Sequence, residues 1–278
     1  MKQTKVRILL VLIVAIIMLV GCVDNSHEVH VSAQEPIFSD AEVEEFRLLA
    51  EQDDAEAQFH LGIMYLMDGD GINAEYWFMR AAEQGHVMAQ NNLGMYYRDV
   101  YQDHEQAVYW FRRAAEQGMI SAQNTLGIMY EEGRGIAQNY EQAAYWYRKA
   151  AEQGNINSQH NLAVLYQNGL GVSQNLESAV YWYRKAAEQG FVSAQANLGI
   201  MYATGSGVIQ SYEQALYWTR LAAEQGEATP QSNLGWMYHH GLGIEQSYEQ
   251  AAHWYRRAIA QGNAQAQVNL DMLPAQYR

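Results

Sequence analysis

The chain has 278 residues, of which 49% are hydrophobic and 17% are charged, and its formal net charge is −14. This composition excludes a disordered tail protein and a collagen-like fibre, and the negative charge argues against a broad nucleic-acid-binding surface. The single cysteine excludes a disulfide framework and a cysteine-based zinc site.

The first 22 residues have the pattern of a targeting segment. Three basic residues precede an uninterrupted apolar run from Ile8 to Val20. This run is too short for a transmembrane helix, which needs about 20 residues, and is typical of a secretory signal. The run ends in Leu-Val-Gly-Cys at Cys22, which resembles the bacterial lipobox. The resemblance implies cleavage before Cys22 and lipidation of its thiol; the alternative is an uncleaved membrane anchor with an incidental cysteine.

The boundaries of the N-terminal segments follow from this interpretation. Residues 1–21 are predicted to be a lipoprotein signal peptide. Residues 22–39 are predicted to be a lipidated tether, because the stretch before the first repeat has no helical or strand periodicity. The residue after the cysteine is Val23. By resemblance to enterobacterial lipoproteins, in which aspartate at that place retains the protein in the inner membrane, we expect an anchor in the bacterial outer membrane, facing the periplasm.

The rest of the chain, residues 40–278, is a tandem repeat. Tryptophans recur at spacings of 33, 36, 36, 36 and 36 residues, at Trp77, Trp110, Trp146, Trp182, Trp218 and Trp254. A regular period of this length is the signature of a solenoid, in which each unit is stabilised by its neighbours. The period predicts six units over about residues 55–262, with half units at residues 40–54 and 263–278, and it places the tryptophans in the core.

Each unit has the pattern of two helices joined by a turn. In the third unit, Leu126 and Tyr130 lie on one helical stripe, and Gly133 marks the turn that follows. Asn139 is a suitable N-cap for the second helix, and Gly154 is suited to the left-handed position that ends it.

Small residues recur within the first helix of each unit. They are Gly62, Gly94, Gly127, Ala163, Gly199 and Gly235. Glycine inside a helix costs about 1 kcal/mol relative to alanine, so its recurrence needs a structural reason. We expect a neighbouring helix or a tryptophan ring to approach the backbone at these positions.

The unit resembles the Sel1-like repeat, a relative of the tetratricopeptide repeat. The matching residues in the third unit are Ala122, Leu126, Gly127, Tyr130, Gly133, Gly135, Ile136, Ala143, Trp146, Tyr147, Ala150, Ala151 and Gly154. The resemblance implies an all-α, right-handed solenoid that serves as an adaptor or binding scaffold. The first two units depart from the pattern in the turn between their helices, so we expect tighter loops there.

The sequence offers no enzyme signature. Its Gly-x-Gly pairs follow helices rather than strands, which argues against a nucleotide-binding loop. A cysteine-rich subgroup of Sel1-type proteins is described as acting on β-lactams, but this chain lacks those cysteines. His239 and His240 are adjacent on a helix and point about 100° apart, so they are poorly placed to share a metal ion with His253. We therefore predict no catalytic residues, no metal site and no cofactor.

Candidate partner-binding residues lie on the first helices. Trp236 breaks a column that is otherwise aliphatic or methionine, and His240 follows it by one turn. An asparagine column, Asn92, Asn161, Asn197, Asn233 and Asn269, precedes the stripe residue. In tetratricopeptide-like folds this helix lines the concave surface, where amide side chains can bind peptide backbone. The alternatives are local repacking around Trp236 and hydrogen bonds between repeats for the asparagines.

A tyrosine column precedes the tryptophans. It comprises Tyr76, Tyr109, Tyr145, Tyr181 and Tyr217, with His253 in the sixth unit. These rings are predicted either to complete the core packing or to form an aromatic ridge for protein contact.

These observations predict a non-catalytic, lipid-anchored scaffold that binds a protein or peptide in the bacterial cell envelope. The first alternative is an immunity protein that neutralises a secreted toxin, such as a phospholipase. The second is an envelope hydrolase or β-lactam-binding protein. The negative charge favours a basic partner or serves solubility.

Overall fold

The computed structural model describes residues 38–278, which form one unit. Every regular element in this part of the chain is helical, which confirms the predicted all-α class. None of the described helices is long and apolar enough to cross a membrane. The predicted signal peptide and Cys22 lie outside the described residues.

Each repeat contributes an A helix followed by a B helix. The A helices are α3 (Ala55–Met67), α5 (Val87–Asp99), α7 (Ile120–Glu132), α9 (Ile156–Asn168), α11 (Val192–Thr204) and α13 (Ala228–His240). The B helices are α4 (Gly71–Glu83), α6 (His104–Glu116), α8 (Tyr140–Glu152), α10 (Leu176–Glu188), α12 (Tyr212–Glu224) and α14 (Tyr248–Ile259). The flanking half repeats are α2 (Asp40–Ala50) and α15 (Ala264–Asp271), the latter followed by a short 3₁₀ helix, η1 (Ala275–Tyr277).

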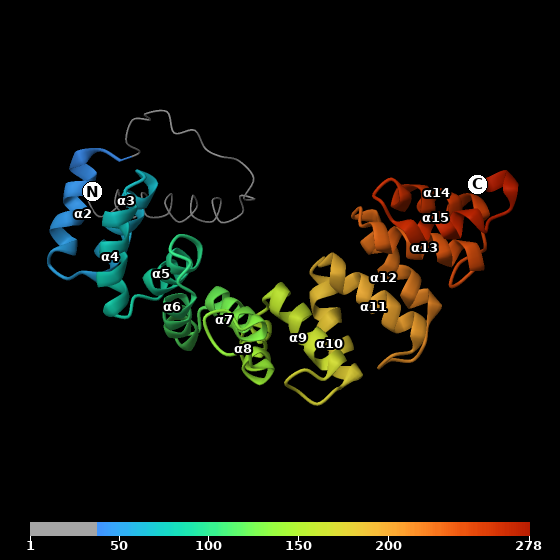
Figure 1. Cartoon of the computed structure of the whole chain (residues 1–278), viewed down its shortest axis with the longest axis horizontal. Coiled ribbons are helices and arrows are strands. Elements are labelled where there is room, and N and C mark those ends of the chain that lie inside the picture. The colour runs from blue at the N-terminus through green and yellow to red at the C-terminus, as the bar shows by residue number, and fades with distance from the viewer. Residues whose placement is uncertain (1–37) are drawn as a thin grey trace, which may run out of the picture. The chain divides into compact units, whose positions relative to one another are not determined.

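The helices pack mainly against their neighbours in the chain. Figure 1 shows the helical hairpins following one another in chain order from α2 to α15, and the extensive contacts join each helix to the next one. Such an arrangement is a solenoid, in which every repeat buries its faces against the repeats on either side.

The loops between A and B helices differ along the chain. In repeats three to six they span seven residues, whereas residues 68–70 and 100–103 suffice in repeats one and two. The expected tighter loops are therefore confirmed. In the longer loops a glycine lies directly against the preceding B helix: a Cβ atom on Gly171, whose φ is +66°, would lie 2.1 Å from the carbonyl carbon of Tyr140. The loop thus docks on the previous repeat through a contact that only glycine permits.

Four of the A-helix glycines face an aromatic ring of the neighbouring B helix, but these rings are not those of the tryptophans, and the fifth, Gly199, faces Thr219. A Cβ atom on Gly127 would lie 2.6 Å from the Tyr147 ring, and Phe78, Phe111 and Tyr255 approach the equivalent glycines in the same way. Each ring belongs to the residue after the tryptophan, because that position of the B helix faces the A helix of its own repeat. Trp77, Trp110, Trp146 and Trp218 are buried in the core, whereas Trp182 and Trp254 are only partly buried.

A ladder of buried glutamines connects the repeats. Each A helix carries a glutamine whose amide donates to a carbonyl of the preceding B helix, as Gln159 does to the oxygen of Ala151 at 3.1 Å. The Gln159 carbonyl accepts from the amide of Gln189 at the end of its own repeat, at 2.8 Å. The A-helix members of the ladder are Gln58, Gln90, Gln123, Gln159, Gln195 and Gln231. Because each amide satisfies a helix-end carbonyl, the ladder fixes the spacing between successive repeats.

Candidate protein-binding site

The B-helix residue after the tryptophan determines what surrounds the asparagine column. In repeat four this residue is Tyr183, whose ring is buried and whose hydroxyl donates to Oε1 of Gln167 at 2.7 Å. In repeat three the Tyr147 hydroxyl donates to Glu131 at 2.5 Å in the same way. Burial raises the pKa of Tyr183 to about 12, so the phenol is neutral at physiological pH.

Two of the predicted asparagines contact these tyrosines. Hydrogen bonds from Asn161 to Tyr147 and from Asn197 to Tyr183 oppose the rise in the tyrosine pKa that burial causes. Asn161 also lies 3.3 Å from His160, whose own pKa is lowered by burial. Both asparagines are partly buried and contribute to hydrogen bonding between repeats, as the alternative interpretation expected.

The arrangement changes at three positions around repeat five. Thr219 stands where the other repeats have Phe or Tyr, and Ala203 stands in the place of Glu131 and Gln167. The third departure, Trp236, belongs to the next A helix, in repeat six, where it interrupts a column of aliphatic residues and methionine. The three residues lie together, because all of them line one cavity between α11, α12 and α13. Thr219 and Ala203 each break a column of the repeat in the sequence. Only the structure shows that both residues line the same cavity.

The cavity has a volume of about 210 Å³ and occupies the position of the missing aromatic ring. Gly199, Ile200, Met237 and Leu242 contribute apolar walls. Its polar lining includes the hydroxyl of Thr219, the amide of Asn233 and the hydroxyl of Tyr212, which accepts a hydrogen bond from Gln210 at 3.2 Å. Neither Thr219 nor Asn233 has a side-chain hydrogen-bond partner within residues 38–278.

An aromatic pair borders the cavity. Trp236 is 44% exposed, and its ring lies 4.4 Å from the ring of His240, measured between centroids, at an angle of 35°. His240 Nδ1 also lies 3.0 Å from the backbone oxygen of Trp236, one turn earlier. Three predicted residues, Asn233, Trp236 and His240, therefore lie on the exposed side of α13. Asn161 and Asn197 belong to the preceding repeats, and Asn92 lies in repeat two.

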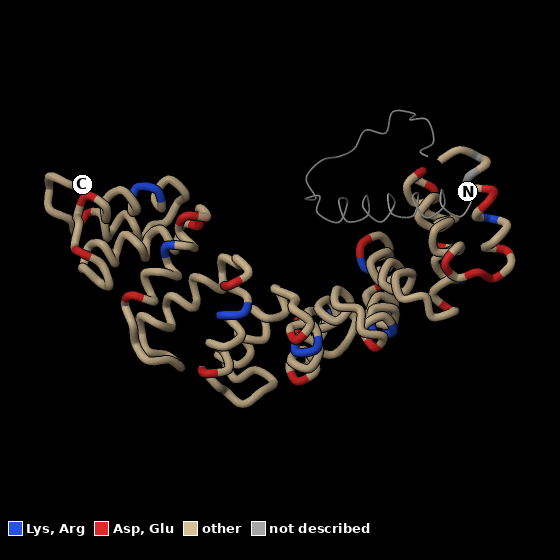
Figure 2. The backbone as a smooth tube through the Cα atoms, turned by 180° about the vertical axis from the view of Figure 1, so that it is seen from behind, with Lys and Arg blue, Asp and Glu red and all other residues tan. Residues whose placement is uncertain are grey.

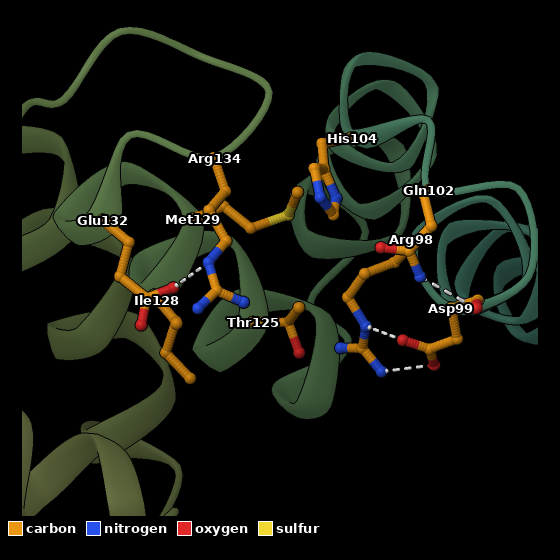
Figure 3. A pocket seen from close by; sticks show the side chains of 9 residues that line it. All are labelled: Arg98, Asp99, Gln102, His104, Thr125, Ile128, Met129, Glu132 and Arg134. Atoms are coloured by element: carbon orange, nitrogen blue, oxygen red, sulfur yellow. Dashed lines mark hydrogen bonds and ion pairs between the residues drawn. The ribbon is translucent and has the colours of Figure 1, made fainter.

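A second cavity, of about 330 Å³, lies between repeats two and three (Figure 3). Its charged groups pair with one another: Arg98 binds both carboxylate oxygens of Asp99 at 2.6 and 2.8 Å, and Arg134 binds Glu132 at 2.8 Å. This pairing leaves the cavity without an uncompensated charge for a ligand.

The tyrosine column lies on the B helices and is exposed. Tyr76, Tyr109, Tyr145, Tyr181 and Tyr217 each leave about half of the side chain accessible. Each ring meets the following tryptophan edge-on, as Tyr181 does with Trp182 at 4.9 Å and 82°. The column thus covers the tryptophans while presenting an aromatic ridge.

Acidic residues gather at the N-terminal end of the described unit. Residues 40–54 hold seven acidic residues and one basic residue, and Figure 2 shows the resulting concentration of negative charge on α2 and the start of α3. Among residues 38–278, no group of three or more histidine, cysteine, aspartate or glutamate side chains is placed to hold a metal ion.

Comparisons with known proteins identify the repeat. The Sel1 repeat model matches residues 55–86, 87–119, 120–155, 156–191, 192–227 and 231–263. No curated protein matches the chain.

Among solved structures, a protective antigen present in uropathogenic Escherichia coli strains is 38% identical, with a TM-score of 0.75. The match covers 82% of this chain and 50% of the antigen, so the chain spans about half the length of that relative. A Sel1 repeat protein from Oxalobacter formigenes is 33% identical, with a TM-score of 0.66, over 77% of this chain and 86% of its own.

A weaker likeness connects the chain to an immunity protein from Pseudomonas aeruginosa. The two are 18% identical with a TM-score of 0.40, over 89% of each chain, and this likeness is too low to carry a functional argument. The six predicted units correspond to the six matched repeats, and the chain belongs to the Sel1 repeat family.

Proposed function

We propose that this protein is a non-catalytic scaffold that binds a protein or peptide partner on the A-helix surface of repeats five and six. The observation that carries the proposal is the exposed Trp236 beside a cavity in which Thr219 and Asn233 have no side-chain hydrogen-bond partner among residues 38–278. Large aromatic rings next to desolvated pockets supply much of the affinity of protein interfaces. A repeat solenoid offers such a surface without further conformational change.

The partner is expected to meet the site in the cell envelope. The proposed lipid on Cys22 attaches the chain to the outer membrane, and residues 22–39 give the repeats a tether of limited reach. The acidic cluster on α2 and α3 favours a basic partner through long-range attraction.

Crosslinking in the native host tests the binding proposal. Photoactivatable residues placed next to Trp236 are expected to crosslink a discrete envelope protein, and Trp236→Ala is expected to weaken that capture by about tenfold or more. Tyr217→Ala, which removes an exposed ring from the tyrosine column, is the matched control. Equal loss in both variants, or no crosslinked protein, would contradict a specific site at Trp236.

The anchor has a separate test. Cys22→Ala is expected to release the chain from membranes during fractionation, because its acyl chains supply the attachment. Continued sedimentation of the variant with membranes would contradict lipidation.

Neutralisation of a secreted toxin is one specific form that this binding could take. It predicts that loss of the protein is lethal only when a competitor delivers the toxin, whereas a general adaptor predicts no such conditional lethality.

A further inference from the structure

The cavity of repeat five lies where each of the other repeats has a buried aromatic ring. In the other five repeats an aromatic side chain occupies the equivalent place: Phe78, Phe111, Tyr147, Tyr183 and Tyr255, each buried. The glycines opposite Phe78, Phe111, Tyr147 and Tyr255 show a close approach of helices A and B. Repeat five keeps that glycine, Gly199, but faces it with the shorter Thr219. The two helices therefore approach as they do at a ring site although residue 219 supplies no ring; the rings of Tyr212 and Trp236 line the cavity from other positions.

The residue that would meet the tip of the ring is truncated as well. Gln167 and His239 lie at the hydroxyl oxygens of Tyr183 and Tyr255, at 2.7 and 3.5 Å, and Ala203 has the equivalent position in repeat five. Shortening both Thr219 and Ala203 opens the cavity from its base to the surface of the A helices. Trp236 stands at this opening, with 44% of its side chain exposed.

The polar groups of the cavity match a phenol. Thr219 contributes a hydroxyl and Asn233 an amide, and neither has a side-chain hydrogen-bond partner within the described residues. The asparagines at the same register, Asn161 and Asn197, donate to the hydroxyl of the tyrosine in the preceding repeat, Tyr147 and Tyr183. A volume of about 210 Å³ suits one side chain rather than a ligand of drug size, for which pockets of about 300–1,000 Å³ are usual.

We propose that this cavity receives the tyrosine side chain of a protein or peptide partner, with Trp236 packed against its ring. This inference rests on the proposed scaffold function and specifies the group that the site recognises. Residues 1–37 contain no aromatic residue, so that segment of the chain cannot supply the ring. The apolar walls stabilise the ring, and Thr219 or Asn233 pairs with its hydroxyl.

The test adds N-acetyl-tyrosinamide as a probe to the full-length protein. Binding is measured by NMR, through the shifts of the side-chain methyl signals. Saturable shifts are expected at Ala203, Ile200 and Met237, which line the cavity. N-acetyl-phenylalaninamide is expected to bind about twofold to tenfold more weakly, because it lacks one hydrogen-bonding group, and N-acetyl-leucinamide more weakly still. Absence of shifts at these methyl groups, or equal binding of the three probes, would overturn the proposal.

Two variants block the cavity from opposite walls. Thr219→Tyr restores the residue of repeats three and four, and Ala203→Met narrows the same space from α11, so one remains informative if the other fails to fold. Both are expected to abolish the shifts caused by the probe. Thr219→Val keeps the shape and removes the hydroxyl, and is expected to reduce the preference for the tyrosine probe. Probe binding that survives both blocking variants would place the site elsewhere and overturn the proposal.

The partner assay separates this proposal from the scaffold function. Loss of the crosslinked partner in Thr219→Tyr supports both. Full capture by Thr219→Tyr, together with loss in Trp236→Ala, keeps the scaffold function and overturns the tyrosine site. Probe binding without any partner keeps the tyrosine site and contradicts the scaffold function. A concentration-dependent dimer that Thr219→Tyr dissociates would place a ring of a second copy in the cavity, and would overturn the assignment to a separate partner.

Discussion

Repeats four and five have the same length and the same pair of helices, yet they use the space between those helices differently. Repeat four fills it with Tyr183, whose hydroxyl is satisfied by Gln167. In repeat five the small side chains of Thr219 and Ala203 leave a cavity in this space. The backbone tolerates both arrangements, because stacking on neighbouring repeats supplies the stability that one missing ring does not. A repeat protein can therefore give up packing in one unit and retain its fold.

The largest expected effect comes from making repeat four like repeat five. Tyr183→Thr removes a buried ring and opens a cavity, so we expect a loss of about 3–5 kcal/mol in the free energy of unfolding, as for other large-to-small core substitutions. Urea denaturation measures it, with Thr219→Ala as the control, expected to cost about 1 kcal/mol. Equal losses in the two variants would show that the rings do not account for the difference between the repeats.

A feature that both repeats share should respond equally. Gly171→Ala and Gly207→Ala place a methyl group within 2.1 and 2.4 Å of the backbone of the preceding B helix. We expect each to cost about 2–4 kcal/mol, from left-handed strain and overpacking together. Gly169→Ala is the control, because it has the strain but only a 3.2 Å contact with a side chain. A cost for Gly171→Ala no greater than for this control would contradict the docked loop.

Ionisation of the buried phenol of Tyr183 makes the stability of repeat four sensitive to alkaline pH. Repeat five has Thr219 at this position and lacks that sensitivity. The pKa of Tyr183 rises from 10.0 to about 12 on burial, so its neutral form stabilises the fold fully below pH 10 and this contribution is lost as the pH rises toward 12. At about pH 11 the loss is on the order of 1 kcal/mol, since this pH lies about one unit above the ordinary tyrosine pKa. Tyr183→Phe is expected to lose less stability than the wild type between about pH 9 and pH 11 in urea titrations. Identical pH profiles would contradict the effect.

The smallest effect concerns the start of each A helix. Asn155 accepts a hydrogen bond from the backbone nitrogen of Ser158 at 2.8 Å, whereas Phe191, at the equivalent position before α11, makes no side-chain cap. Asn155→Ala is expected to cost about 1 kcal/mol. Thermal or urea denaturation checks this, and Phe191→Asn provides the reverse variant, which is expected to add a cap while losing the contact of the ring with His160.

Much of the fold could be predicted from the sequence. The 36-residue period, the turn glycines and the N-caps such as Asn139 are local signals, since each depends on the conformation of a few consecutive residues. The same period identified the columns that face the core or the surface. It did not reveal which ring faces the A-helix glycine, because Trp146 and Tyr147 are adjacent in the chain and only the helix crossing selects one of them.

The candidate site was predicted in part. Trp236 was recognisable as a break in an aliphatic column, and Asn233 and His240 were named with it. Thr219 and Ala203 also break columns of the repeat, but only their proximity to Trp236 in the structure links these breaks to one site. The glutamine ladder was also missed, since its hydrogen bonds join residues of successive repeats.

The sequence by itself determined the repeat, the number of units and the helical class, because these follow from periodicity and from turn and cap chemistry along the chain. Only the tertiary structure decided that three departures from the period meet at one cavity, and that Thr219 and Asn233 beside it lack side-chain partners in the described part of the chain. The physical reason is that packing and hydrogen bonding depend on distances between helices, and the stacking of the repeats sets those distances.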